Sequence, residues 1–279
     1  RIGGAANVAL NLRALGAEPI ICSIKGNDKD GALLKELLLE NKLSADALLN
    51  DYSRGTTVKT RIIGNGHQLL RIDEESTNDI DATLEDLIFD VVTGLIANVD
   101  VLIFQDYNKG LLTPRLIKLV SELCIAKNVP IVVDPKFNNF FEYQGVTLFK
   151  PNKKELLQAE NIGTNLSLTE LMQLGENVRN KLNVKTLMTT LSEDGVMILS
   201  EEGKVHLPAH PRKIVDVSGA GDSVLSVAAL CVACGVSEEL TAELSNLAGG
   251  IVCEQVGVVP IDRDALFSEA MELNVSERY

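Results

Sequence analysis

The chain has 279 residues, of which 46% are hydrophobic and 23% charged, and its formal net charge is −13. This composition is typical of a globular protein with a sizeable core, and so acidic a surface excludes nucleic acid and anionic membranes as natural partners. The five cysteines follow no regular framework, which predicts a reducing, cytoplasmic setting and not a disulfide-stabilised fold.

Apolar strand-like runs alternate with amphipathic helical stretches along most of the chain. Strands are predicted at residues 19–24, 99–105, 130–134, 146–149, 185–190 and 196–200. Helices are predicted at 5–15, 31–41, 84–97, 114–127 and 169–182, and then at 219–234, 238–254 and 262–272. This order predicts an α/β fold with a mostly parallel sheet and helices on both faces. Ligands of such sheets bind beyond the carboxyl ends of the strands.

One segment departs from this alternation. Residues 56–63 and 68–72 are strand-like and are separated by Gly64-Asn65-Gly66, a hairpin turn signal. We therefore predict a single domain over residues 1–279 with a small hairpin appendage at about 56–72. The appendage would be a lid over a pocket, a contact in a homodimer, or both.

The most informative motif is Asp216-Val217-Ser218-Gly219-Ala220-Gly221-Asp222, at the start of a predicted helix. Helix N-termini carry unpaired N–H groups, and glycines let an anionic oxygen approach them closely. Asp222 would lie beside this phosphate cradle and accept a proton from an attacking hydroxyl. An aspartate that merely caps the helix is the alternative, and from these residues alone the two are evenly matched.

Two nucleotide motifs are excluded near this segment. A dinucleotide fingerprint would need a third glycine where Val224 stands, and no Gly-x-x-x-x-Gly-Lys-Ser/Thr loop occurs in the chain. A second glycine segment, Gly3-Gly4-Ala5-Ala6-Asn7, also runs into a predicted helix. Taken alone it is more typical of a tight helix start than of a binding site.

Together, the two glycine segments resemble the signatures of the ribokinase/PfkB family of carbohydrate kinases. Further matches follow in the family's order over essentially the whole chain: Gly26-Asn27-Asp28 through Gly31, Asp134-Pro135-Lys136, Pro151-Asn152-Lys153-Lys154-Glu155, and Thr190 through Gly195. The resemblance implies a ribokinase-like fold and transfer of the γ-phosphoryl group of ATP to a sugar hydroxyl.

The resemblance also implies roles for individual residues. Asp222 would be the base, and the amides of Gly219, Ala220 and Gly221 the anion hole. Asn152 and Glu155 would organise Mg²⁺ through water, and Asp216 would help to bind a monovalent cation, usually K⁺. The residues expected along ATP are Asn152, Lys153, Lys154, Glu155, Thr190, Ser192, Gly195, Gly221 and Asn246. Gly3, Gly4 and Asn7 would face the sugar.

The chain departs from the family pattern in two places. Ser218 stands where the family has Thr, which keeps the hydroxyl. The family's first strand, with a sugar-binding Asp before the double glycine, is not in this sequence, and we expect it to precede Arg1 in the complete protein.

Several stretches are most similar to the kinases of ADP-heptose biosynthesis: Gly3 through Ala9, Leu69-Leu70-Arg71-Ile72-Asp73, Asp106-Tyr107-Asn108-Lys109-Gly110, Asp134-Pro135-Lys136 and Lys150-Pro151-Asn152. The similarity implies phosphorylation of D-glycero-β-D-manno-heptose 7-phosphate at its anomeric hydroxyl. Because Lys109 and Lys136 each follow a strand, they are candidates to hold a substrate phosphate, with Asp106 and Arg71 as further substrate candidates; solvated lysines are the alternative. No His-x-Gly-His adenylyltransferase signature occurs, so only the kinase step is predicted.

Three other functions remain open at this point. One alternative is a different acceptor, such as ribose, fructose, fructose 6-phosphate or a nucleoside. A sugar- or nucleotide-binding regulator without turnover is a second alternative, which the intact Asp222, Asn152 and Glu155 disfavour. An NAD-dependent dehydrogenase fits the βα alternation but lacks the N-terminal fingerprint.

Overall fold

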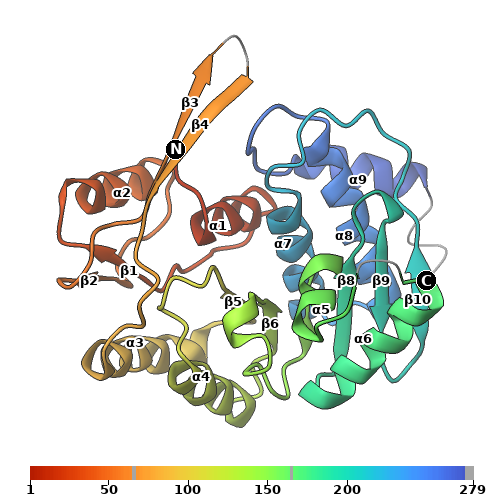
Figure 1. The fold of residues 1–279 in the computed structure, drawn as a ribbon, viewed down its shortest axis with the longest axis horizontal. Helices are drawn as coiled ribbons and strands as arrows, with labels where there is room; N and C mark the ends of the chain where they lie inside the picture. Colours follow the sequence, from red (N-terminus) through yellow and green to blue (C-terminus); the bar gives the residue numbers. More distant parts are fainter. Residues whose placement is uncertain (65–66, 164–165, 274–279) are drawn as a thin grey trace.

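A computed structural model describes residues 1–64, 67–163 and 166–273. Within them, six strands form a central sheet in the order β10-β9-β8-β7-β6-β5 (Figure 1). They are β5 (Leu102–Gln105), β6 (Ile131–Asp134), β7 (Leu148–Phe149), β8 (Thr186–Thr190), β9 (Val196–Leu199) and β10 (Lys204–Leu207). The strands from β5 to β8 pair in parallel, whereas β9 and β10 pair antiparallel. The predicted α/β class with a mostly parallel sheet is confirmed.

Both faces of the sheet are covered by helices. Ile131 and Val133 of β6 join one buried cluster, and Val132 between them joins the cluster on the opposite face. A strand buried on both sides needs apolar residues at successive positions, which accounts for the unbroken Ile-Val-Val run.

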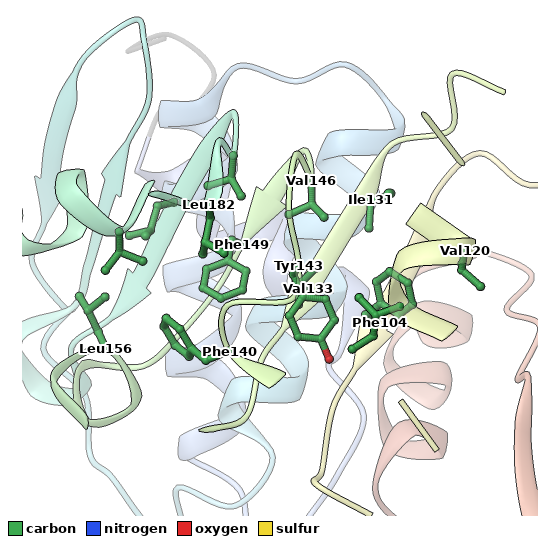
Figure 2. Packing of buried hydrophobic residues seen from close by; sticks show 14 of the residues in the cluster. Phe104, Val120, Ile131, Val133, Phe140, Tyr143, Val146, Phe149, Leu156 and Leu182 are labelled. Atoms are coloured by element: carbon green, nitrogen blue, oxygen red, sulfur yellow. The ribbon is translucent and has the colours of Figure 1, made fainter. Parts of the chain in front are cut away.

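The helices of the first face are α3 (Ala82–Leu95), α4 (Pro114–Ala126), α5 (Lys153–Ala159) and α6 (Leu168–Leu182). They bury leucines, isoleucines and valines against aromatic residues of the sheet and of the segment after η2 (Phe137–Asn139). Figure 2 shows Phe140, Tyr143 and Phe149 in the middle of this cluster. Two shorter 3-10 segments, η1 (Ile96–Asn98) and η3 (Ser192–Asp194), follow α3 and β8.

The second face is covered by α1 (Ala5–Ala14), α7 (Ala220–Ala233) and α8 (Glu238–Cys253). The last helix, α9 (Arg263–Glu272), packs against α7 and α8 in a cluster of its own. This arrangement brings the first helix of the chain beside the helix that follows the Ser218-Gly219 segment.

Two smaller sheets lie outside the central one. β1 (Ser23–Gly26) pairs in parallel with β2 (Leu48–Asp51), and α2 (Lys29–Glu40) lies between them in sequence. β3 (Val58–Gly64) and β4 (His67–Glu74) form the predicted antiparallel hairpin, which projects from the body (Figure 1). Asn65 and Gly66 of the predicted turn lie outside the described residues.

A few elements were not predicted. β2, with the sequence Leu-Leu-Asn-Asp, and β10, with Lys-Val-His-Leu, are four residues long and too polar to give a strand pattern. α5 has only seven residues, so its apolar period is too short to recognise. No helix in the described part of the chain has the length and apolar character that crossing a membrane would require.

Candidate active site

The start of α7 is built to leave backbone N–H groups open. Gly219 is its N-cap residue, at φ 86°, and no side chain caps the helix. A residue with a Cβ is strained at that φ, and a Cβ there would lie 3.3 Å from Val258 and 3.4 Å from the Asn7 amide nitrogen. A Cβ at Gly221 would meet nothing within 4 Å. The N–H of Ala220 donates to Val217 O at 3.3 Å, so the amides of Gly219 and Gly221 are the freer part of the predicted anion hole.

Asp222 occupies the first turn of α7 and joins it to α1. The amide of Asn7 donates to Asp222 Oδ2 at 2.6 Å, and the Tyr107 hydroxyl lies 3.5 Å from Oδ1. The Tyr107 ring lies beside Gly4, where a Cβ would make an ordinary contact with it at 3.5 Å, and the φ of 61° favours glycine at this position. The structure therefore brings together the two glycine segments and the loop after β5.

A buried polar residue fixes the contact between the two helices. Asn11 is fully buried, and its side-chain oxygen accepts from Ser223 Oγ at 3.0 Å and from the Ile261 amide at 2.9 Å. Its amide donates to the carbonyl of Asn7 at 2.9 Å. Asn7 is thus positioned by its neighbour one helical turn later, and Asp222 in turn by Asn7.

The surroundings make Asp222 a stronger base than an exposed aspartate. Burial raises the pKa of Asp222, and the Asn7 hydrogen bond and the charge of Lys150 only partly oppose it. Burial also raises the pKa of Tyr107, as does the negative charge of Asp222, so the phenol stays protonated and can donate. A carboxylate of this kind beside open helix N–H groups can accept a proton while an anion is held close by.

A buried ion pair lies behind Asp222. Lys150, 2% exposed, follows β7, and its ammonium lies 3.4 Å from Asp134 Oδ2 at the end of β6. Gln105, at the end of β5, donates to the same oxygen at 3.1 Å. Three neighbouring parallel strands thus deliver polar side chains to one edge of the sheet, as the topology predicts.

Asp216 braces the loop before α7. Its Oδ1 accepts from the Ser218 amide at 2.9 Å and its Oδ2 from the Gly257 amide at 3.0 Å. The hydrogen bonds from Ser218 lower the pKa of Asp216, so it is ionised at neutral pH. Asp216 is therefore an anionic oxygen donor beside the cradle, which fits the predicted cation site.

The start of α5 is closed by its own side chains. Asn152 Oδ1 accepts from the Glu155 amide at 2.9 Å, and Glu155 Oε2 accepts from the Asn152 amide at 2.9 Å, which is a capping box. Lys136 donates to the other oxygen of Glu155. Burial would lower the pKa of Lys136, but Asp134 and Glu155 raise it above its usual value.

Asn152 and Glu155 offer the amide and carboxylate oxygens that Mg²⁺ prefers, at the place where their capping box starts α5. The residues present therefore fit a magnesium ion at this place. Lys136 lies beside Glu155 and adds a positive charge there, so its predicted role in holding a substrate phosphate stays a prediction.

The segment predicted along the nucleotide runs from the end of β8 through η3. Thr190 donates to Pro151 O at 3.3 Å, which joins this segment to the start of α5, and Ser192 has a positive φ of 57°. Gly195 has a structural reason to be glycine, since its φ is 88° and a Cβ would lie 2.1 Å from Leu207 O. The Asn246 amide donates to Pro208 O at 2.9 Å and so holds the next loop. Lys153 lies 3.8 Å from Asp194, and Lys154 is exposed.

A cavity of about 340 Å³ opens on the outer side of this segment, and Lys153, Asp194 and His206 line it with apolar residues of α6. None of Asn7, Tyr107 and Asp222 lines it. The candidate active site is therefore the place where Asn7, Tyr107 and Asp222 meet, and this cavity lies apart from it.

The remaining predicted substrate residues lie in three regions: the loop after β5, the base of the hairpin and the segment before α1. Asp106 is 2% exposed, and its oxygens accept from Tyr143 Oη and the Asn108 amide, both at 2.8 Å, so it positions the loop after β5. Lys109 and Arg71 belong to an ionic network at the base of the hairpin, where they pair with Glu75 at 2.5 Å and Asp73 at 3.0 Å. Gly3 is exposed and has open space beside it.

Four side chains at the site were not assigned a role from the sequence: Asn11, Tyr107, Asp134 and Lys150. A signal existed for two of them. Asn11 lies four residues after Asn7 in an apolar helix pattern, and Asp134 ends an apolar strand, so helix period and strand end could have indicated a buried face and a ligand edge. Nothing in the local sequence indicates that Lys150 is buried.

Residues 1–264 match the family described as pfkB family carbohydrate kinase. Among curated proteins, the chain is 38% identical over 272 residues to the bifunctional protein HldE of Syntrophotalea carbinolica, covering 97% of this chain and 55% of that protein. It is 37% identical over 258 residues to HldE of Geobacter metallireducens, covering 92% and 52% respectively. The chain thus spans about half the length of the curated relatives it matches.

Solved structures with the same fold are more distant in sequence. Phosphofructokinase-2 from Escherichia coli in complex with fructose-6-phosphate superposes with a TM-score of 0.80 at 19% identity, covering 98% of this chain and 87% of that one. Arabidopsis thaliana ribokinase complexed with ribose and ATP gives a TM-score of 0.76 at 17% identity, covering 96% and 86%. At these identities the likeness establishes the ribokinase-like fold.

Proposed function

The chain belongs to the pfkB family of carbohydrate kinases, and on that premise we propose that it phosphorylates D-glycero-β-D-manno-heptose 7-phosphate at the anomeric hydroxyl, with Asp222 as the base. The product would be the 1,7-bisphosphate, a step of ADP-heptose biosynthesis. The observation that carries the mechanism is the 2.6 Å hydrogen bond from Asn7 to Asp222, at the open start of α7.

The proposed reaction needs alignment and charge neutralisation more than covalent chemistry. Asn7 fixes the orientation of the Asp222 carboxylate, so that its Oδ1 is directed toward Tyr107 and the acceptor. Asp222 takes the proton from the attacking hydroxyl, and the raised pKa makes it a better acceptor for that proton. The amides of Gly219 and Gly221 hold the transferred phosphoryl oxygens, where the helix dipole favours negative charge.

Mg²⁺ would be held through water by Asn152 and Glu155, with Asp134 nearby, and would neutralise charge on the ATP phosphates. Lys136 adds positive charge to the same region through its bond to Glu155. A monovalent cation would bind at Asp216, which already joins the cradle loop to Gly257.

The choice of acceptor rests on sequence similarity. The stretches around Arg71, Lys109 and Lys150 resemble the heptose kinases, and the HldE relatives are 35–38% identical over nearly all of this chain. The relatives are named bifunctional and are about twice as long as the part matched here, which accords with a kinase half joined to a second activity.

The experiment that tests the proposal is ADP release with Mg²⁺ and K⁺ across a panel of sugars. The panel holds heptose 7-phosphate, free heptose, ribose, fructose, fructose 6-phosphate and a nucleoside. We expect kcat/KM to be highest for heptose 7-phosphate. A higher value for another sugar would keep the kinase and discard the heptose assignment, and ATP binding without turnover on any sugar would favour a regulator.

We also propose that the hairpin forms a homodimer. On one face of the hairpin Ile62 pairs with Leu70 and Thr60 with Ile72, and these apolar side chains are 43–51% exposed. Lys59, Arg61, Arg71 and Asp73 alternate with them and lie on the other face. An exposed apolar face of this kind would be buried by a second copy. Sedimentation should give a dimer at micromolar concentration, and the double variant Ile62→Lys, Leu70→Lys should sediment as a monomer; a monomeric wild type would reject the dimer.

A further inference from the structure

Two lysines from different parts of the fold share one carboxylate. Lys59 Nζ of β3 lies 2.9 Å from Glu75 Oε2 and 2.9 Å from Asp73 Oδ2, and Lys109 Nζ lies 2.5 Å from Glu75 Oε1. Glu75 directly follows β4, whereas Lys109 belongs to the loop after β5 that also carries Tyr107. The side chains of Lys59, Lys109 and Glu75 are 37%, 29% and 20% exposed, so water reaches all three.

Hydrogen bonds to other segments hold the backbone of the Lys109 loop, whereas the Lys109 side chain is partly exposed to solvent. Arg54, paired with the buried Asp51, donates to Lys109 O at 2.9 Å. Gly110 O accepts from the Ile80 amide at 2.9 Å, and Gly110 has a φ of 73° against the Asn78 carbonyl, where no Cβ fits. The backbone of Lys109 is therefore held in place, and its flexible side chain lets the ammonium exchange its anionic partner without movement of the backbone.

The charges at this place favour an anion larger than a carboxylate. Glu75 is ionised at neutral pH, since the hydrogen bonds from Lys109 and Lys59 lower its pKa. A sugar phosphate carries close to two negative charges and three terminal oxygens. It can bridge two ammonium groups at once and would outcompete a single carboxylate that is free to rotate away into solvent.

We propose that Glu75 is an internal counter-ion that the phosphate of the acceptor sugar displaces, and that Lys59 and Lys109 together form the subsite for that phosphate. This inference rests on the proposed function in that the acceptor is a phosphorylated sugar. It adds Lys59 and Glu75 as residues that determine specificity. Without substrate, Glu75 links Lys59 of the hairpin to Lys109 of the loop after β5. After displacement, the phosphate of the substrate would link these two lysines.

The first test compares three variants by their KM values for heptose 7-phosphate, free heptose and ATP. Glu75→Gln should lower KM for the phosphorylated sugar by about two- to fivefold, because an exposed competing ion pair is lost. Lys59→Met should raise the same KM about tenfold. Neither change should alter KM for ATP. Glu74→Gln is the matched control, because Glu74 is exposed, pairs with Val58 and lies on the opposite face of the hairpin.

A purely structural link between hairpin and loop would behave differently. Glu75→Gln would then raise KM for both the phosphorylated and the free sugar, and that outcome would overturn the proposal. An unchanged KM for the sugar phosphate in Lys59→Met would overturn it as well.

A second measurement separates this inference from the identity of the sugar. Inorganic phosphate is titrated into the protein without sugar or nucleotide, and binding is followed by calorimetry. Glu75→Gln should bind phosphate more tightly than wild type, and the double variant Lys59→Met, Glu75→Gln should lose that gain. If this pattern holds while the panel prefers an unphosphorylated sugar, the subsite stands and the heptose assignment fails; equal phosphate binding in all three proteins would reject the subsite.

Discussion

The N-termini of α7 and α5 differ in whether side chains cap their unpaired backbone N–H groups. At α7 the N-cap is a glycine with no side-chain cap, so the helix offers its amides to an outside anion. At α5 Asn152 and Glu155 cap the helix themselves, so it offers side-chain oxygens in place of amides. The N-terminus of α7 therefore leaves amides open to the phosphate that we propose there, whereas the N-terminus of α5 presents the oxygens that we propose for Mg²⁺.

The largest effect should come from Asp222, the carboxylate in the first turn of α7. We expect Asp222→Asn to lower kcat by roughly 10²–10⁴ because the general base is lost. ATP binding should persist, since the amides of Gly219 and Gly221 remain. Turnover near that of wild type would show that Asp222 is not the base. The uncapped N-terminus of α7 would then have no assigned part in the reaction.

The next test adds a methyl group to the open start. Gly221→Ala places a Cβ in open space, where no protein atom lies within 4 Å. Alanine is the better helix former, so thermal stability should be equal or slightly higher than in wild type. Turnover should nevertheless fall by about 10², because the methyl group keeps phosphoryl oxygens from the amides. Full activity would mean that no anion approaches at this position.

A third test uses the pH profile. Burial raises the pKa of Asp222 above its ordinary 3.8, and the Asn7 hydrogen bond lowers it part of the way back. In Asn7→Ala that bond is gone, so the acidic limb of kcat/KM should move to higher pH than in wild type. An acidic limb in the same place would show that Asn7 does not act on Asp222.

The same raised pKa gives a stability prediction with a definite sign. The unfolded carboxyl ionises at lower pH than the folded one, so the charge of Asp222 destabilises the fold as pH rises through the folded pKa. Asp222→Asn should therefore have a higher Tm than wild type at pH 7. The difference should shrink toward pH 3.8, and thermal melts at both pH values measure it.

The smallest effects should appear in stability at the two helix starts. Asn152→Ala should lower the free energy of unfolding by about 1 kcal/mol, while Asn152→Asp keeps the cap and should lose little. Gly219→Ala should cost roughly 1–2 kcal/mol, because alanine is strained at the φ of 86°. Chemical denaturation measures all three. Two results would contradict this comparison of the helix N-termini. One is an unchanged free energy of unfolding in Gly219→Ala, and the other is a loss of stability in Asn152→Asp as large as that in Asn152→Ala.

The sequence allowed much of this fold to be predicted, for identifiable physical reasons. The buried strand at Ile131 and the helix at Ala220 have apolar patterns long enough to recognise, and both were predicted within a residue or two. β2, β10 and α5 were missed because they are short and two of them are polar. The local sequence pattern does not predict an element that is stabilised mainly by contacts with segments distant in sequence.

The candidate site was predictable only in part. Asp222 and Asn7 each stand in a glycine motif, but their 2.6 Å contact joins positions 215 residues apart and follows from the packing of α1 on α7. The partners of Lys109 and Lys136 could not be read from the sequence at all. Glu75 and Glu155 meet these lysines only because strand order and the hairpin bring them together.

The bonds of α1 to α7 and Ile261 join segments that are synthesised far apart in time, so we expect them to limit when activity appears. Asn7 reaches Asp222, and Asn11 reaches Ser223 and Ile261, which are 212 and 250 residues away in sequence. Asn7 can therefore orient Asp222, the base that we propose, only after α7 has left the ribosome and docked on α1, and Asn11 gains its bond from Ile261 later still. Contacts of such long range form late and slowly. The recovery of activity on refolding should lag behind the recovery of helix content, which makes enzyme activity a reporter of the last tertiary contact to form.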